Sequence, residues 1–246
     1  AAAAALAALR GRRSRLASSK IVKLTYLDAK SSGEPIRLAL HVACVAFEDV
    51  RASYDEVNRL RGSGYLPFGQ VPALEVDGQV FAQSQAILRW VGRQTGLYPD
   101  DLQIQIDQVD EALVDLRSVL RPGWYGSVLG RHPLTGKPLL ELTPGQRAEV
   151  IELLNTVVLP ARLAQLEQLL TMTSPGPLVC GGRLTIADLS LYVYASGLLD
   201  GTGVPAGVSS QLLEACPRIL AQVRHVEALP AVAEWNRLAA APQGAR

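Results

Sequence analysis

The stretch that decides the fold is FGQVPALEVDGQVFAQSQAI, residues 68–87. Within it, apolar runs from Val71 to Val76 and from Gln79 to Ala82 flank the pair Asp77-Gly78, a strong signal for a β-hairpin. A helix is expected from Ser84 to about Gly96, because apolar side chains recur there at helical spacing. The stretch thus predicts two antiparallel strands followed by a helix.

Upstream of the hairpin, the sequence predicts a strand, a helix and a second strand. Ile21 to Tyr26 has the pattern of a short strand, and an apolar helix is expected from about Glu34 to Ala46. A strand is expected around Phe47 to Tyr54, and residues 59–69 are predicted to form a loop, because Gly, Pro and charged residues cluster there. The order is βαβ and then ββα, which indicates an α/β domain over residues 21–98.

Downstream of Pro99 the apolar spacing becomes helical, and strand signals almost disappear. We therefore expect residues 99–246 to form an all-helical C-terminal domain. Residues 123–145 are rich in Gly and Pro and are expected to form an inserted loop. The predicted helices run from about Ile104 to Leu120, Pro144 to Met172, Leu189 to Leu199, Ser209 to Ala228 and Pro230 to Ala240.

The composition argues against several classes of protein. Twenty-four Lys and Arg against twenty-three Asp and Glu leave a net charge of +1, which disfavours nucleic acid as a partner. No run of eighteen apolar residues lacks charges, so no membrane span is expected. The histidines lack zinc-site spacing, so no metal is expected. An odd number of cysteines without a close pair favours a reducing compartment, and we expect buried thiols at Cys44, Cys180 and Cys216.

Residues 1–20 form an N-terminal extension with a composition of its own. The segment has no acidic residue and contains four arginines and Lys20 among alanines and serines. This composition is typical of an organelle transit peptide, and an extension without function is the other interpretation. We expect a cytoplasmic protein, with a plastid or a mitochondrion as the alternative destination.

Five motifs occur here in the order found in one known family. They are a strand ending in Tyr26, the segment 68–74, the pairs Asp77-Gly78 and Gln83-Ser84, a capping box from Thr185 to Asp188, and Leu229-Pro230 before Trp235. With these motifs, residues 21–240 resemble the glutathione transferases, and among them the sigma class, which includes glutathione-dependent prostaglandin D synthases. The resemblance implies a thioredoxin-like N-terminal domain, a helical-bundle C-terminal domain and glutathione as co-substrate. It also implies a small hydrophobic electrophile and a homodimer active in detoxification.

The resemblance assigns the catalytic role to Tyr26. A glutathione thiol has an ordinary pKa of roughly 8.5, so little thiolate is present at neutral pH. Lowering that pKa by about two units needs roughly 2.7 kcal/mol of preferential interaction with the anion. One charge-assisted hydrogen bond from a hydroxyl can provide most of it. Without the resemblance, Tyr26 is explained as a strand tyrosine with its ring in the core.

The resemblance also implies which residues bind glutathione. Val71 and Pro72, joined by a cis peptide bond and preceded by Gln70, would pair through their backbone with the extended tripeptide. Gln83 and Ser84 would receive the γ-glutamyl carboxylate, with Ser84 also capping the helix that begins there. Taken alone, Pro72 is explained as a turn proline and Ser84 as a simple cap.

An acidic residue on the first long helix is implied to act across a subunit interface. Asp107, Glu111 and Asp115 recur every four residues and share one helix face. By resemblance, Asp115 would reach the ammonium group of glutathione bound to the other subunit. A solvated acidic face is the alternative explanation.

Two regions depart from the family's pattern. Ser32 stands where the sigma class commonly has an arginine beside the thiolate, so that cation is absent or comes from elsewhere. Arg59 and Ser63 replace a tryptophan and a lysine near the glycine carboxylate of glutathione. Arg59 or Arg61 would restore a cation there, and both are equally explained as exposed loop charges.

Other features leave alternatives open. Cys44 is a rival nucleophile, but its predicted place about three turns into a helix indicates a packed, inert thiol. The electrophile pocket is expected between the domains near Arg117, with Trp124 and Tyr125 either lining it or packing the inserted loop. A glutathione-dependent isomerase and a non-catalytic binding or structural protein are the alternative functions.

Overall fold

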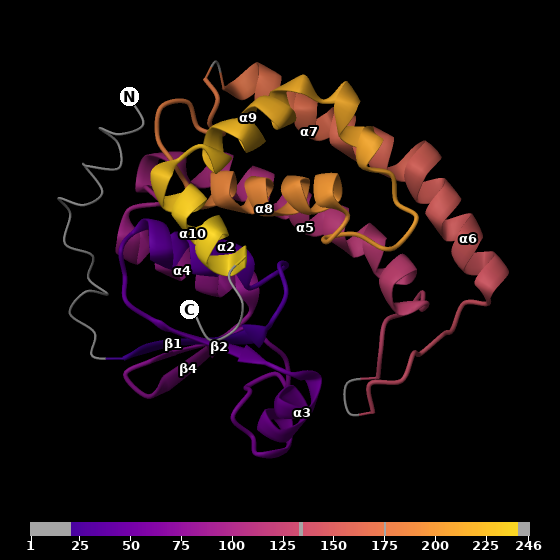
Figure 1. Cartoon of the computed structure of the whole chain (residues 1–246), viewed down its shortest axis with the longest axis horizontal. Coiled ribbons are helices and arrows are strands. Elements are labelled where there is room, and N and C mark those ends of the chain that lie inside the picture. The colour runs from indigo at the N-terminus through magenta and orange to yellow at the C-terminus, as the bar shows by residue number, and fades with distance from the viewer. Residues whose placement is uncertain (1–20, 133–134, 175, 241–246) are drawn as a thin grey trace.

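The computed structural model describes residues 21–132, 135–174 and 176–240 and confirms the predicted fold class (Figure 1). An α/β domain with one four-stranded sheet comes first, and a domain of helices follows. Helices α2 and α4 lie between the sheet and the helical domain, whereas α3 lies beyond the sheet on the other side. The predicted N-terminal extension lies outside the described residues.

The sheet has the order β2-β1-β3-β4, with β1 parallel to β2 and antiparallel to β3. Asp77 and Gly78 both have positive φ, 49° and 86°, as the tight turn of the predicted hairpin requires. Tyr26 is in register with Arg51 near the end of β1, so its backbone lies in the middle of the sheet. The strands are β1 Val22–Leu27, β2 Glu48–Ala52, β3 Ala73–Val76 and β4 Gln79–Ala82.

Two predictions about the first domain are wrong in detail. Helix α3, Tyr54–Gly62, occupies part of the expected loop, and a capping box between Ser53 and Glu56 starts it. Helix α2, Glu34–Val42, ends before Cys44, whose φ is 54° and whose side chain is exposed. Cys44 is therefore not a packed helical thiol, and it lies at the end of α2 away from Ser32. The prediction for α4, Ser84–Thr95, holds, with Gly96 as its left-handed C-cap.

In the second domain, α5 continues to Tyr125, although the sequence predicted its end near Leu120. Pro122 lies inside the helix although proline is unfavourable there, and Gly123, the next residue, packs closely against Pro205 and Ile151. The inserted segment consequently begins at Gly126. The helical segments are η2 Asp100–Leu102, α5 Gln103–Tyr125, α6 Pro144–Leu153, the π-helical η3 Leu154–Val158, α7 Leu159–Thr173, α8 Ile186–Asp200, η4 Ser210–Ala215, α9 Pro217–Glu227 and α10 Pro230–Ala240.

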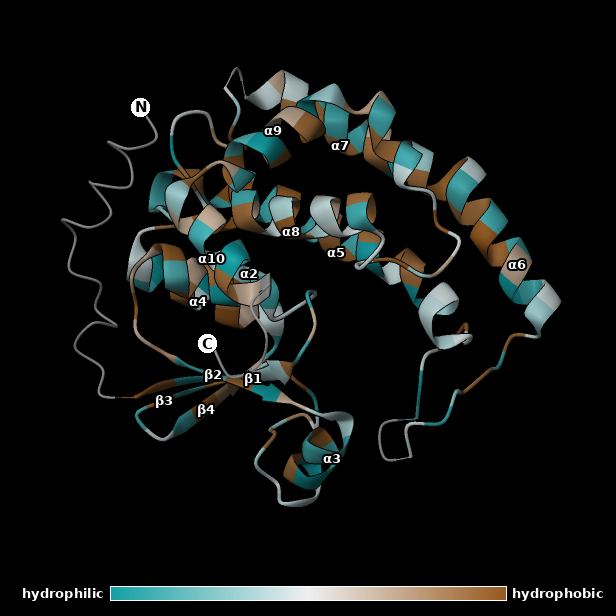
Figure 2. Ribbon diagram, in the orientation of Figure 1, coloured by the Kyte–Doolittle hydropathy of each residue, from teal (hydrophilic) through white to brown (hydrophobic). Residues whose placement is uncertain are grey.

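One apolar core runs through both domains and fixes their relative position. It includes Leu24 and Leu74 of the sheet together with Leu113 of α5 and Leu189 of α8, each at most 1% exposed. Figure 2 shows hydrophobic residues recurring along α8, the helix at the centre of the second domain. Burial of this apolar surface on both sides makes the domains one packed unit.

Buried polar contacts fasten the start of α8 and the last helix of the second domain. Asp188 accepts hydrogen bonds from the backbone N–H groups of Thr185 and Val179, at 2.8 and 2.7 Å, so the predicted capping box is present. In α10, the Trp235 Nε1 donates to the Glu34 Oε1 of α2 at 2.7 Å, across 201 residues of sequence. The last helix is thus attached to the first domain.

Two features are absent from the described residues. No helix there is long and apolar enough to cross a membrane. No group of three His, Cys, Asp or Glu side chains in that part of the chain is arranged to hold a metal ion. The expected burial of all three cysteines is wrong, since Cys44 is exposed and Cys180 is half-buried, while Cys216 is buried.

Candidate functional site

Tyr26 lies near the end of the central strand β1, and two residues lie close to its ring. Its side chain is only 7% exposed. A Cβ added at Gly33 would overlap the Tyr26 ring, so this glycine permits a close approach of the loop before α2. The Arg37 guanidinium also lies near the ring, 5.6 Å from its centroid. The ring therefore has little freedom to turn.

The loop that follows Tyr26 is fastened by a buried arginine. Arg37 donates to the carbonyl oxygens of Leu27 and Ala29, both at 3.1 Å. It also pairs with the carboxylates of Asp49 at 2.8 Å and Glu34 at 3.2 Å. Since Arg37 is fully buried, each of these contacts is needed to compensate its charge. The network fixes the backbone between β1 and α2.

A second arginine reaches the same loop from the helical domain. Arg117 of α5 donates from Nη2 to the Ser32 Oγ. Its Cζ lies 4.8 Å from the centroid of the Tyr194 ring, which belongs to α8. Burial raises the pKa of the Tyr194 hydroxyl to about 12, so this group stays protonated at neutral pH. The loop itself lacks an arginine at Ser32, and the guanidinium of Arg117 lies beside this serine.

The segment before β3 presents a backbone edge. The Val71-Pro72 peptide bond is cis, as predicted, with Pro72 buried and Gln70 exposed. The Arg61 Nε donates to the carbonyl oxygen of Gly69 at 2.7 Å and holds this segment against α3. Arg59 is also on α3, with an exposed side chain. Arg61 therefore has a structural contact, and Arg59 is the more available cation of the two.

The start of α4 differs from the prediction for Ser84. The N-cap position belongs to Gln83, no side chain caps the helix, and Ser84 is its first residue. Gln83 has φ 73°, a conformation that residues other than glycine rarely adopt, and this turn shifts the cap by one residue. The prediction that Ser84 caps the helix is wrong. No side-chain oxygen accepts a hydrogen bond from the backbone N–H groups in the first turn of α4. Free N–H groups at the start of a helix attract an anion.

The acidic face of α5 is divided between two environments. Asp107 pairs with Arg89 of α4 at 2.7 Å, and Glu111 pairs with the same guanidinium. Asp115, one turn further on, is exposed and forms no ion pair within the described residues. Asp107 is therefore half-buried against Arg89, whereas Glu111 and Asp115 are exposed, as a solvated face would require.

Comparisons with known proteins match both domains. Residues 22–93 match the N-terminal domain of glutathione S-transferases, and residues 140–237 match their C-terminal domain. The chain is 34% identical to Glutathione S-transferase 1 of Ascaris suum over 220 residues, which are 87% of this chain and 94% of the relative. The chain belongs to the glutathione S-transferase family. As a member of this family it is a transferase that uses glutathione.

Solved structures of this family have the same fold. The glutathione S-transferase from Ascaris lumbricoides is 29% identical and covers 90% of this chain and 98% of its own, with a TM-score of 0.71. A rat hPGDS structure in complex with a quinoline is 25% identical and covers 88% and 96%, with a TM-score of 0.70. The two-domain arrangement is therefore that of known glutathione S-transferases.

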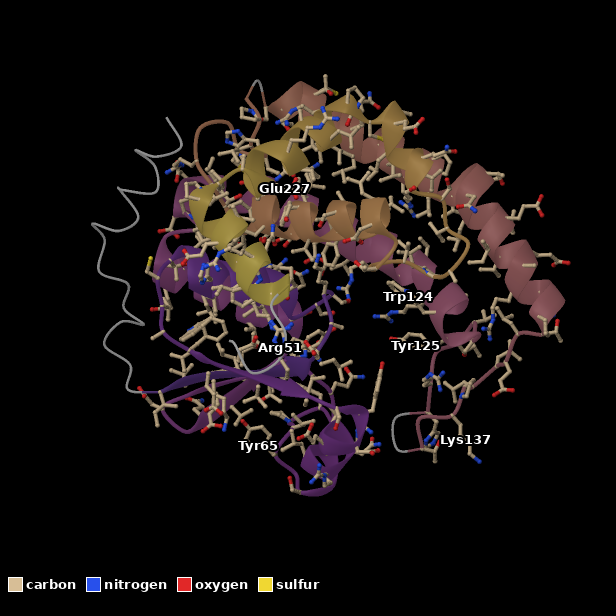
Figure 3. The ribbon with its side chains drawn as sticks, in the orientation of Figure 1. Arg51, Tyr65, Trp124, Tyr125, Lys137 and Glu227 are labelled. Carbon is tan, nitrogen blue, oxygen red and sulfur yellow. The ribbon has the colours of Figure 1, made fainter. Side chains whose placement is uncertain are left out.

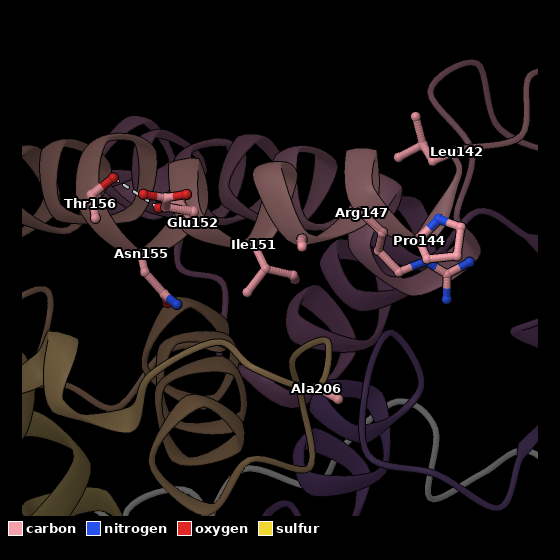
Figure 4. Close-up of a pocket in the computed structure, with 9 residues that line it drawn as sticks. Leu142, Pro144, Arg147, Ile151, Glu152, Asn155, Thr156 and Ala206 are labelled. Carbon is pink, nitrogen blue, oxygen red and sulfur yellow. Dashed lines mark hydrogen bonds between the residues drawn. The ribbon is translucent and has the colours of Figure 1, made fainter.

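Tyr26 does not line the pocket that the structure shows in the helical domain of this transferase. A pocket of about 750 Å³ lies between α6, η3 and the loop of Ala206 (Figure 4). Figure 3 shows Trp124 and Tyr125 at the end of α5, close to the segment that carries Lys137. Trp124 packs on the apolar core, whereas Tyr125 is 44% exposed beneath the Arg131 guanidinium. For Trp124, this favours packing over lining the electrophile site.

Proposed function

We propose that this glutathione S-transferase conjugates glutathione to small hydrophobic electrophiles and that Tyr26 donates a hydrogen bond to the glutathione thiolate. The proposal rests on the position of the Tyr26 side chain near the end of β1. Gly33 packs closely against its ring, and the Arg37 guanidinium lies near the same ring. A ring held in this way loses little conformational entropy when its hydroxyl binds an anion. The motif pattern favours the sigma class within the family.

The proposed reaction requires one proton transfer and one substitution. The thiol of bound glutathione releases its proton to solvent, and the Tyr26 hydroxyl stabilises the resulting thiolate. The sulfur lone pair then forms a bond to an electrophilic carbon. With chlorodinitrobenzene, the carbon–chlorine bond breaks and chloride leaves with its electron pair.

Glutathione would lie along the edge formed by residues 70–72 and the start of α4. The Val71 backbone would pair with the cysteinyl unit, next to Gln70 and Pro72. Gln83 and Ser84, with the free N–H groups of the first α4 turn, would bind the γ-glutamyl carboxylate. The exposed Arg59 would supply the cation for the glycine carboxylate at the other end.

The exposed Asp115 supports a homodimer in this proposal. Its carboxylate would bind the γ-glutamyl ammonium of glutathione in the partner protomer. A relative from Necator americanus, 27% identical, is described as monomeric. Analytical ultracentrifugation decides between these states for this protein. A monomer with full glutathione affinity would remove this role from Asp115.

A glutathione-dependent isomerase of the prostaglandin type is the second candidate. It is favoured by the likeness to rat hPGDS, which extends over 96% of that structure. Such an enzyme would use the same thiolate and would regenerate glutathione at the end of the reaction. It would show a thiolate at neutral pH but little conjugation of chlorodinitrobenzene.

The test compares wild type with Tyr26→Phe and with Tyr54→Phe, a control at a tyrosine that is 75% exposed. Retention on immobilised glutathione measures binding, and chlorodinitrobenzene conjugation measures transfer. A charge-assisted hydrogen bond contributes about 1.5–3 kcal/mol, so Tyr26→Phe is expected to lower kcat/KM by roughly 10- to 150-fold. Full activity in Tyr26→Phe would refute the role of the tyrosine. Absence of both retention and activity in wild type would favour a non-catalytic protein.

A further inference from the structure

A cation approaches the loop beside Tyr26 from the second domain. Arg117 of α5 is 85 residues from Ser32 in the chain, and its Nη2 donates to the Ser32 Oγ. Ser32 is followed by Gly33, whose α-carbon faces the Tyr26 ring. The guanidinium therefore lies at the loop that also confines the Tyr26 side chain.

Within the described part of the chain, this guanidinium has few protein partners. Among the residues that the structure describes, no carboxylate forms an ion pair with Arg117, and its buried Nε has no hydrogen-bond partner. Its other close neighbour is the ring of Tyr194, at 4.8 Å. Arginine remains charged at every accessible pH, and a partly buried charge without a counter-ion is unfavourable. The arrangement is suited to a ligand that brings an anion.

Two other arginines show how this protein satisfies a structural guanidinium. Arg37 binds two carboxylates and two backbone carbonyl oxygens. Arg89 pairs with both Asp107 and Glu111. Arg117 differs from both, because its protein contacts are a hydroxyl and an aromatic ring, which leave its charge uncompensated. Arg218 also has a buried Nε without a partner, but its two terminal nitrogens donate to the carbonyl oxygens of Pro177 and Leu178, which Arg117 does not do.

We propose that Arg117 supplies positive charge to the glutathione thiolate and that the Ser32 hydroxyl positions its guanidinium. The inference rests on the proposed function, since it requires glutathione bound with its sulfur at Tyr26. In this arrangement, the charge that the sigma class commonly carries on the loop comes instead from α5. An opposite charge within about 4–6 Å lowers the pKa of an acid by about 1–3 units, and the thiol is expected to respond in this way.

The charged and titratable groups around this position come from four elements. Tyr26 belongs to β1, Arg37 to α2, Tyr194 to α8 and Asp110 to α5 itself. Because the Tyr194 hydroxyl stays protonated at neutral pH, it does not neutralise the guanidinium. The effect of Arg117 on the pKa of bound glutathione is therefore measured with the Arg117 variants, which leave these groups in place, and Tyr26→Phe serves as the comparison for the tyrosine.

The experiment measures the ultraviolet absorbance of the thiolate against pH, at saturating glutathione. The variants are Arg117→Gln, Arg117→Lys, the double variant Ser32→Arg with Arg117→Gln, and Tyr26→Phe. Arg121→Gln is the matched control, because Arg121 lies one turn further along α5 and is exposed. Circular dichroism checks that each variant is folded.

Arg117→Gln is expected to raise the pKa of bound glutathione by about one unit or more and to lower kcat/KM at neutral pH about tenfold, with recovery at alkaline pH. Arg117→Lys and the double variant, which both keep a cation, should have a lower thiol pKa than Arg117→Gln. Arg121→Gln should match wild type. If the Arg117 variants and wild type titrate alike while Tyr26→Phe does not, the inference is wrong and the proposed function stands. If wild type holds no thiolate at neutral pH, the proposed function itself fails.

Discussion

Asp110→Asn is predicted to remove a pH-dependent loss of stability. Asp110 lies on the inner face of α5, fully buried, and neither of its carboxylate oxygens has a hydrogen-bond partner in the described structure. Burial raises the pKa of this carboxyl from 3.8 to about 7, and the nearby Ser190 hydroxyl and Arg89 guanidinium only partly oppose the rise. The ionised form is thus unfavourable in the folded protein.

The sign of the effect follows from where the proton binds. Between pH 3.8 and about 7 the folded protein holds a proton on Asp110 that the unfolded chain has released. Stability therefore falls as the pH rises through this window and is constant above it. A shift of about three units corresponds to a loss of about 4 kcal/mol, at 1.36 kcal/mol per unit. Asparagine is neutral throughout, so the variant lacks this loss.

Urea unfolding at a fixed protein concentration, repeated between about pH 4 and pH 8, measures the effect. The free energy of unfolding of Asp110→Asn minus that of wild type should increase by about 4 kcal/mol across the series. Asp115→Asn removes an exposed carboxylate from the same helix and is the control for the change in net charge. A difference between Asp110→Asn and wild type that does not vary with pH would refute the reasoning.

Two further substitutions test the geometry of the site. Gly33→Ala places a methyl group against the Tyr26 ring, so thermal unfolding should show a loss of about 1–3 kcal/mol, and kcat/KM should fall. Unchanged values would show that the loop adapts. Gln83→Gly relieves a φ of 73° and should raise the free energy of unfolding by up to about 1 kcal/mol, while calorimetry should show weaker glutathione binding. An equally tight glutathione complex would exclude Gln83 from the binding site.

Local signals in the sequence predicted much of the fold. The Asp77-Gly78 turn, the helix from Ser84 and the box from Thr185 to Asp188 depend on residues a few positions apart, so a single sequence contains all the information that they need. Helix α3 has an equally local signal in Ser53 and Glu56. This capping box predicts a helix start at Ser53, although the glycines that follow favour a loop.

The remaining errors arise from contacts between distant residues. The last turn of α5 persists past Pro122, where Pro205 packs on Gly123, and nothing near residue 122 indicates this. The exposure of Cys44 follows from the early end of α2, which turns the chain at that residue. The meeting of Arg117 with Ser32 spans 85 residues and needs the folded interface between the domains. The sequence showed that Ser32 carries no charge, but it could not show that Arg117 lies beside it.

The hydrogen bond from Trp235 to Glu34 means that the contacts of the first domain are completed only when the last helix has been synthesised. A chain leaves the ribosome from its N-terminus, so Glu34 and the loop of Tyr26 are made long before residue 235 exists. A chain that stops before Pro230 would bury Glu34 less completely and would expose apolar surface of α2. Premature termination near the end of this protein should therefore produce a chain that is recognised for degradation, although its entire first domain has been made.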